Sequence, residues 1–245
     1  MRNLLSAGFA RLWRSKVFWL SCAFLAAATV SSVWTRYSDG FYYLDTAFMY
    51  YVLFIAILIP LVCALFIGTD YADGTIRNKL ICGHSRGSLY LSNLIVCSAA
   101  SLIMCTFAVV PGLCVGLPLL GGFTMDPVKA VLFFICVYTL SLVWTALFTL
   151  LAMLVSNRTV AVVAALLLSL TLLAAGANLN DPADVPEGRV RDTIQFLSDS
   201  TPGGQTLQLV NQRAERPEVL IAYDAVLFAL STGAGLLLFR RKDLK

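Results

Sequence analysis

The chain has 245 residues, of which 59% are hydrophobic and 13% charged, and its mean hydropathy is +0.80. Soluble domains carry about 45–50% apolar and about 25% charged residues, so this composition excludes an ordinary soluble domain. It predicts one domain, residues 1–245, embedded in a membrane over nearly its whole length. The net charge of +4 does not indicate nucleic-acid binding, because the basic residues lie at the ends of apolar segments.

Residues 2–16 have the pattern of an amphipathic helix. Leu5, Phe9, Leu12 and Trp13 fall near one helical face, and most of the arginines lie elsewhere. This pattern predicts a helix that lies in the membrane interface before the first span. A basic flank without fixed structure is the alternative for so short a segment.

Six apolar stretches are long enough to cross a bilayer as helices, which needs about 20 residues. They are residues 17–35, 47–69, 89–110, 128–155, 159–177 and 219–239. The first is longer than the apolar part of a signal peptide, so we interpret it as a retained span, with cleavage after residues 26–28 as the alternative. The third apolar run continues to Leu120, and Pro111, Gly112, Gly116 and Pro118 are expected to break its helix near the membrane surface.

The distribution of Lys and Arg predicts the orientation, because cytoplasmic segments carry the excess of both. Twelve of these residues fall in the N-terminus, the segment 70–86, the turn at Arg158 and the C-terminal tail; six fall in the opposite set of segments. Both termini are therefore expected in the cytoplasm.

The longest polar connection, residues 178–218, is expected on the outer side. Its seven acidic residues outnumber its four arginines: Asp181, Asp184, Glu187, Asp192, Asp199, Glu215 and Glu218. Apolar residues on both sides of Pro202-Gly203-Gly204 predict a short helix-turn-helix that dips toward the membrane, which irregular backbone can do where protein covers it.

Several kinds of chemistry have no matching motif. The chain has no G-x-x-x-x-G-K-[ST] phosphate-binding loop, no H-E-x-x-H, and a single His, His84. The seven Cys lie mostly in apolar runs without a C-x-x-C pair, so we interpret them as small buried hydrophobic residues. Asp224 is the one acid within a span; because it is shallow, we interpret it as reaching interfacial water, with a functional role as the alternative.

The most informative segment is the polar island at residues 70–86, DYADGTIRNKLICGHSR, between the second and third spans. Asp73 or Thr75 can cap the start of a helix, and Gly83 is a natural terminator after Cys82. Ser85 or Ser88 can start the helix of the third span. Two turns are marginal alone, so this helix is expected to pack on the membrane interface or on a partner protein.

With these features the chain resembles a permease subunit of an ABC transporter of the ABC-2 type. The resemblance rests on Asp70 and Asp73, then Gly74-Thr75, a short basic-apolar helix and Ser85-Arg86; the family often has Glu at the acid and Pro where this chain has His84. The N-terminal Arg-Leu-Trp-Arg-Ser-Lys, the six spans, the Pro-Gly-Gly-Gln of the long loop and the Phe-Arg-Arg-Lys-Asp ending agree with it. The implied fold is all-α and polytopic, with six transmembrane helices, an interfacial N-terminal helix, a short cytoplasmic coupling helix and a re-entrant-like outer loop.

The resemblance implies a non-enzymatic subunit of an ATP-hydrolysing complex in the bacterial cytoplasmic membrane. A second permease chain, identical or related, would pair with it, and two copies of a separate ATPase would bind ATP and Mg; no cofactor is expected in this chain itself. The residues implied in coupling to the ATPase are Asp70, Asp73, Gly74, Thr75, Ile76, Arg77, Asn78, Lys79, Leu80 and Arg86.

The implied activity is export, along a path lined by the first, second and fifth spans. The uncharged spans favour a hydrophobic or amphipathic cargo such as an antimicrobial peptide, a drug or a lipid. The alternative is a membrane sensor or assembly protein that uses segment 70–86 as a docking site. An intramembrane enzyme is disfavoured, because the spans hold no paired His, no paired deep acids and no Ser-Lys dyad.

Overall fold

The structure is a computed structural model that describes residues 1–40, 43–44, 49–179, 189–214 and 216–242. Four acids of the long loop lie outside these residues: Asp181, Asp184, Glu187 and Glu215.

The described residues form helices and no strand, which confirms the all-α polytopic fold. The helices are α1 (Arg2–Arg14), α2 (Lys16–Ser38), α4 (Tyr51–Ala72), α5 (Thr75–Ile81), α6 (Arg86–Leu120), α7 (Pro127–Leu154), α8 (Arg158–Leu179), α9 (Arg189–Ser200), α10 (Pro202–Val210) and α11 (Pro217–Arg241). Within the described residues, six helices are long and apolar enough to cross a membrane: α2, α4, α6, α7, α8 and α11. These are the six predicted spans, with ends shifted by up to ten residues.

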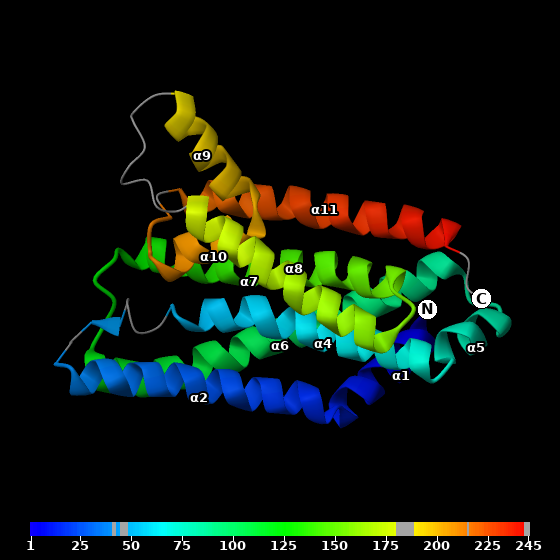
Figure 1. Cartoon of the computed structure of the whole chain (residues 1–245). Helices are drawn as coiled ribbons and strands as arrows, with labels where there is room; N and C mark the ends of the chain where they lie inside the picture. The colour runs from blue at the N-terminus through cyan, green and yellow to red at the C-terminus, as the bar shows by residue number, and fades with distance from the viewer. Residues whose placement is uncertain (41–42, 45–48, 180–188, 215, 243–245) are drawn as a thin grey trace.

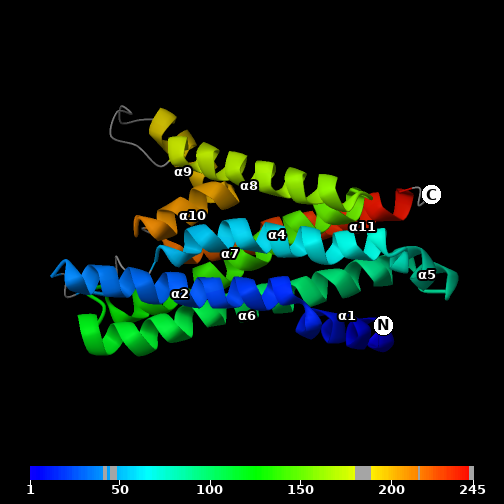
Figure 2. The ribbon, with the colours of Figure 1, turned by 60° about the horizontal axis from the view of Figure 1, so that its bottom comes forward.

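The six long helices run side by side and alternate in direction along the chain (Figure 1). Both termini and the short helix α5 lie at one end of the bundle, which we call the termini end. The hairpin of α9 and α10 lies at the opposite, distal end, and Figure 2 shows the same separation after rotation. Helix α5 of the polar island and the described part of the long loop, α9 and α10, therefore lie at opposite ends of the bundle.

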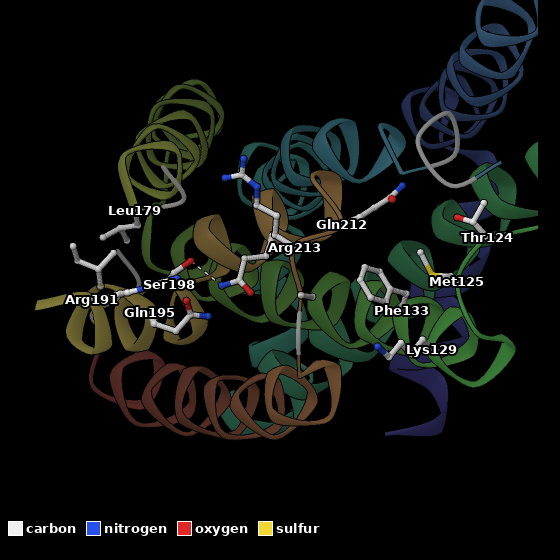
Figure 3. A pocket seen from close by; sticks show the side chains of 13 residues that line it. Thr124, Met125, Lys129, Phe133, Leu179, Arg191, Gln195, Ser198, Gln212 and Arg213 are labelled. Atoms are coloured by element: carbon white, nitrogen blue, oxygen red, sulfur yellow. Dashed lines mark hydrogen bonds between the residues drawn. The ribbon is translucent and has the colours of Figure 1, made fainter. Parts of the chain in front are cut away.

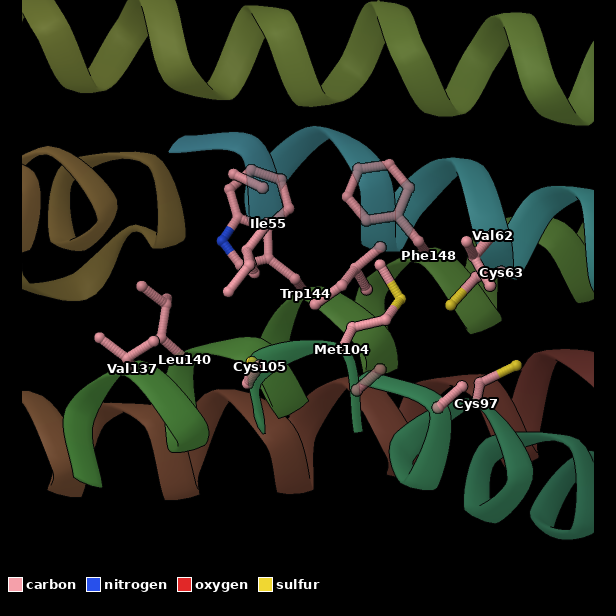
Figure 4. Packing of buried hydrophobic residues seen from close by; sticks show 14 of the residues in the cluster. Ile55, Val62, Cys63, Cys97, Met104, Cys105, Val137, Leu140, Trp144 and Phe148 are labelled. Carbon is pink, nitrogen blue, oxygen red and sulfur yellow. The ribbon is translucent and has the colours of Figure 1, made fainter. Parts of the chain in front are cut away.

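The centre of the bundle is formed by α4, α6 and α7. Half or more of the most apolar window of each is buried inside the chain, against about a third or less for α2, α8 and α11. Trp144 and Phe148 of α7 stack at a centroid distance of 5.6 Å, and Ile55 and Met104 lie in the same buried cluster (Figure 4). The outer helices α2, α8 and α11 thus leave apolar surface for lipid or another chain.

The third span is longer than predicted, because α6 continues without a break from Arg86 to Leu120. Its 35 residues correspond to about 52 Å, well beyond the hydrocarbon core. Pro111 and Pro118 lie inside the helix, so the predicted break is wrong: neighbouring helices and local adjustment let membrane helices tolerate proline. Gly116 serves close packing instead, since a Cβ there would lie 2.3 Å from Cδ1 of Leu44.

The N-terminal segment forms the predicted helix, α1, rather than an unstructured flank. Leu4 and Leu12 are buried and Leu5 and Phe9 pack against the core, so most of the predicted apolar face is correct. Trp13 is the exception at 49% exposed, because α1 packs its other side on α6. That α1 lies in the membrane interface stays a prediction.

The predicted helix-turn-helix of the long loop is present as α9 and α10. Helix α10 is largely buried and packs on α8, α4 and α7. A Cβ on Gly203 would lie 1.9 Å from the carbonyl oxygen of Leu172 in α8, so glycine is required for the two backbones to approach. Nε1 of Trp144 donates to Oγ1 of Thr206 at 3.2 Å and ties α10 to the bundle centre.

The seven Cys form no disulfide. Five are buried, as the apolar runs around them predict, and two are exposed. The buried ones are Cys22, Cys63, Cys97, Cys105 and Cys136; the exposed ones are Cys82 and Cys114.

Candidate functional site at the termini end

Asp70 lies in the last turn of α4, and its carboxylate joins three helices. The side chain is 1% exposed. Oδ1 accepts hydrogen bonds from Nη1 of Arg11 in α1 and from Oγ1 of Thr75 in α5, and Oδ2 accepts one from Nζ of Lys79 at 3.2 Å. A buried carboxylate is tolerated where charged and polar donors satisfy it. We call these four residues the Asp70 junction.

The predicted short helix exists as α5, but its start differs from the prediction. Gly74 is the N-cap residue, in a left-handed conformation with φ of 65°, and no side chain caps the helix. Thr75 is the first helical residue, and its hydroxyl donates to the carboxylate and the carbonyl (3.0 Å) of Asp70. Asp73 is instead the C-cap residue of α4. The prediction that Asp73 or Thr75 caps α5 is wrong, because the buried carboxylate takes the Thr75 hydroxyl as a donor.

The predicted end of α5 at Gly83 is confirmed. Gly83 has φ of 86°, and its N–H donates to the carbonyl of Leu80 at 3.0 Å. The N–H of His84 donates to the carbonyl of Lys79 at 3.3 Å, which completes a Schellman motif. Ser85 then caps α6 by accepting from the N–H of Ser88 at 3.2 Å. Helix α5 is thus a separate element with a defined turn at each end.

The residues of α5 divide into two faces. Ile76 is 2% exposed, and Leu80 packs against the core. Arg77 and Asn78 are exposed, and the Ile81 side chain is 77% exposed. The inner face therefore fixes α5 to the bundle, and the outer face presents a cation, an amide and an uncovered apolar side chain at the extreme end of the molecule (Figure 1).

Arg86 does not join the Asp70 junction but holds the end of the last span. Its Nη1 donates to the carbonyl of Arg240 at 2.9 Å and to that of Lys242 at 2.5 Å. These carbonyls belong to the open C-terminal end of α11, where a cation is favourable. The chain on either side of α5 is thus bonded to α1 through Asp70 and to α11 through Arg86.

Sequence reasoning missed three residues that complete this arrangement: Arg11, Tyr71 and Lys242. Nζ of Lys242 donates to Oη of Tyr71 at 2.9 Å and to the carbonyl of Met153 at 3.0 Å, so the C-terminal segment also contacts α4 and α7. Burial lowers the pKa of Lys242 to about 8. Arg11 and Lys242 each belong to a basic flank, and nothing in the sequence separates them from neighbours that serve orientation alone.

A pocket of about 540 Å³ lies at the distal end between α7, α9 and the residues after α10. Figure 3 shows Lys129, Gln195, Gln212 and Arg213 along its wall. Nε2 of Gln208, on α10, donates to Oγ of Ser198 at 2.8 Å and to Oδ1 of Asp199 at 2.7 Å, which fixes the angle between α9 and α10. The lining is basic and rich in amides, unlike the apolar surface of the spans.

Asp224 is buried within the chain, at 2% exposure, and does not reach solvent. Its Oδ2 accepts a hydrogen bond from Oγ1 of Thr139 in α7 at 2.5 Å. The interpretation as an interfacial, water-exposed acid is therefore wrong, because α7 packs closely along α11 and covers the side chain. Among the described residues, no group of three or more His, Cys, Asp and Glu could hold a metal ion.

These features define a multi-pass α-helical membrane protein with a small anchored helix at one end and, at the other, a helical hairpin whose second helix, α10, is buried. Residues 4–176 match the family model of the ABC-2 family transporter proteins, and the chain belongs to that family. It is a transmembrane permease component, and the family implies an ATPase partner in the transporter. No curated protein matches the chain.

Proposed function

We propose that this chain is the permease of an ATP-driven exporter and that α5 is its coupling helix, seated in a groove of a separate ATPase. The observation that carries the proposal is the Asp70 junction. A force on α5 would act through Thr75 and Lys79 on a buried carboxylate of α4, a central helix of the bundle. A flexible loop without such bonds would bend under the force and would not transmit it to the spans.

In the assembly that we propose, the chain lies in the bacterial cytoplasmic membrane with both termini and α5 in the cytoplasm. The excess of Lys and Arg in the segments of the termini end supports this orientation. Two ATPase copies bind ATP and Mg, and a second permease chain, identical or related, pairs with this one. No ATP-binding loop occurs in the chain, so the energy has to come from the partner.

The path that we propose is lined by α2, α4 and α8, and the cargo is hydrophobic or amphipathic. Both α2 and α8 contact α4, and both leave most of their apolar surface uncovered within one chain. Large apolar side chains are exposed along α8, among them Val163, Leu167 and Leu170. An antimicrobial peptide, a drug or a lipid would suit such a surface better than a strongly anionic glycan.

The coupling assignment can be tested with Asn78→Pro in the complex of permease and ATPase. The N–H of Asn78 donates to the carbonyl of Gly74 at 3.1 Å, so proline removes a bond of α5 and disrupts the helix. We expect substrate-stimulated ATP hydrolysis and transport to be lost. Asn78→Ala keeps the helix and is the matched control.

Charge reversal at Arg77, which is exposed, is expected to weaken ATPase binding without unfolding the permease. If both the ATPase complex and its stimulated hydrolysis survive Asn78→Pro, α5 is not the coupling helix. A chain that purifies as a stable, monodisperse species and never captures an ATPase would instead support the sensor or assembly alternative.

A further inference from the structure

A second pocket, of about 300 Å³, lies at the termini end between α1, α2, α4 and α8. Three arginines line it: Arg11 and Arg14 from α1, and Arg158 at the start of α8. Asp73 is the acid in its lining. We call it the arginine pocket. Positive charge therefore exceeds negative charge around a cavity at the edge of the bundle.

Four residues in the lining of the arginine pocket are apolar. They are Val62, Leu65 and Phe66, from the last turns of α4, and Val17 at the start of α2. These residues belong to the spans, whereas the arginines flank them. The cavity is thus polar where the chain leaves the membrane and apolar where the hydrocarbon begins, which is the profile of an amphiphile rather than of a free ion.

Arg11 is held in place, but two of its nitrogen atoms have no acceptor among the described residues. Its guanidinium carbon lies 3.7 Å from the centroid of the Phe66 ring, and Nη1 donates to Asp70. Nε and Nη2 are shielded from solvent and have no hydrogen-bond partner among the described residues. A guanidinium offers five N–H donors in a rigid fork that suits phosphate, and buried donors without an acceptor cost free energy.

Arg14 and Arg158 are exposed, so each is able to reach an anion without disturbing the packing. We infer that the arginine pocket binds the phosphate headgroup of an anionic phospholipid, with the glycerol and upper acyl chains along α4 and α2. The site needs only a membrane at the termini end; it rests on the proposed function solely for the identity of the leaflet, which would be the cytoplasmic one.

A lipid bound in the arginine pocket would also affect the Asp70 junction. Arg11 contributes to both, since it lines the pocket and donates to the carboxylate that also holds α5. A bound phosphate would share the charge of Arg11 and fix the position of α1 relative to α4. The lipid would therefore act as a structural part of the α5 attachment.

The test uses the full chain purified in a neutral detergent and titrated with phosphatidylglycerol, with native mass spectrometry to count bound lipid. We expect preferential binding over phosphatidylcholine. The variant Arg14→Gln/Arg158→Gln should bind phosphatidylglycerol at least about tenfold more weakly, since two charge-assisted contacts are lost. Arg14→Lys/Arg158→Lys, which keeps the charge, should recover part of the binding.

Lys16→Gln is the matched control, because Lys16 is an exposed cation beside the pocket that does not line it. It should bind phosphatidylglycerol as the unaltered chain does. Equal binding of the two lipids, or equal loss in the control and in the double glutamine variant, would overturn the proposal. Displacement of the lipid by millimolar inorganic phosphate at constant ionic strength would show an anion site instead. None of these measurements uses ATP, so their failure would leave the coupling assignment intact.

Discussion

Arg11 donates to the carboxylate of Asp70 across 59 positions of the sequence, and this contact fastens the N-terminal helix α1 to the end of α4. The same carboxylate accepts from Thr75 and Lys79 of α5, the helix that we propose as the coupling helix. Asp70 is 1% exposed, whereas the Arg11 side chain is 33% exposed. The acid is the buried member of this pair, so the cations surround the acid. The carboxylate of Asp70 therefore holds α1, α4 and α5 together.

Asp70→Asn should weaken the attachment of α1 and α5 to α4. The amide leaves Arg11 and Lys79 without their counter-charge, and loss of such charged hydrogen bonds costs about 1–3 kcal/mol. We expect a lower thermal midpoint for the purified permease and loss of substrate-stimulated ATP hydrolysis in the complex. Asp126→Asn alters an exposed acid before α7, away from α5 and from the arginine pocket, and should do neither. Equal behaviour of the two variants would contradict a special role for Asp70.

The two faces of α5 predict opposite effects for two isoleucines. Ile76→Ala removes a buried side chain, which costs about 2–5 kcal/mol, and should lower the thermal midpoint of the permease. Ile81→Ala alters an exposed side chain and should change stability by no more than about 0.5 kcal/mol. Co-purification with the ATPase should nevertheless fall for Ile81→Ala. Unchanged ATPase capture would show that the outer face of α5 is not the contact surface.

Arg86→Gln should free the C-terminal end of α11. The two carbonyl contacts from Arg86 disappear, so amide hydrogen exchange in the last turn of α11 should become faster. Arg241→Gln, which alters an exposed cation in that same turn, serves as the control. If exchange rises equally in both variants, the attachment does not depend on Arg86.

Gly203→Ala should separate α10 from α8. The added Cβ would lie 1.9 Å from the carbonyl oxygen of Leu172, a distance that the packing cannot absorb without a shift of α10. Overpacking of this kind costs about 1–3 kcal/mol and should appear as a lower thermal midpoint. Gly122→Ala meets open space and is the control. A stable Gly203→Ala chain would mean that α10 is not closely packed.

Stability should depend on pH through Lys242. Its pKa is about 8 in the folded chain, because burial disfavours the charged form, against 10.5 ordinarily. The cost of burying the charge is complete below pH 8 and disappears as the pH rises from 8 to 10.5, where the unfolded chain binds more protons. The thermal midpoint of the unaltered chain should therefore rise relative to Lys242→Met between pH 7.5 and 9.5. A difference that stays constant or falls would contradict this account.

Much of the fold follows from local patterns in the sequence. Six apolar stretches must become helices in lipid, because no other lipid-exposed structure satisfies the backbone, and the ends of α7 and α8 match their predicted limits within two residues. The turn at Gly83 and the cap at Ser85 were also predictable, because they depend on one residue and its nearest neighbours. The continuity of α6 through Pro111 was not predictable, because the tolerance of this proline depends on helices distant in sequence.

By itself, then, the sequence determined a six-span helical protein with a short helix in the polar island between the second and third spans. The ten candidate coupling residues of that island came from the resemblance to the ABC-2 family. Only the tertiary structure decided that Asp70 is buried under Arg11 of α1, that Arg86 holds the end of α11, and that Asp224 is covered by α7. Hydrophobic periodicity and helix capping act within a few residues, so composition and spacing reveal them. The pairing of a single carboxylate with one of several equivalent cations depends on which helix ends meet, and the packing of the bundle alone sets that.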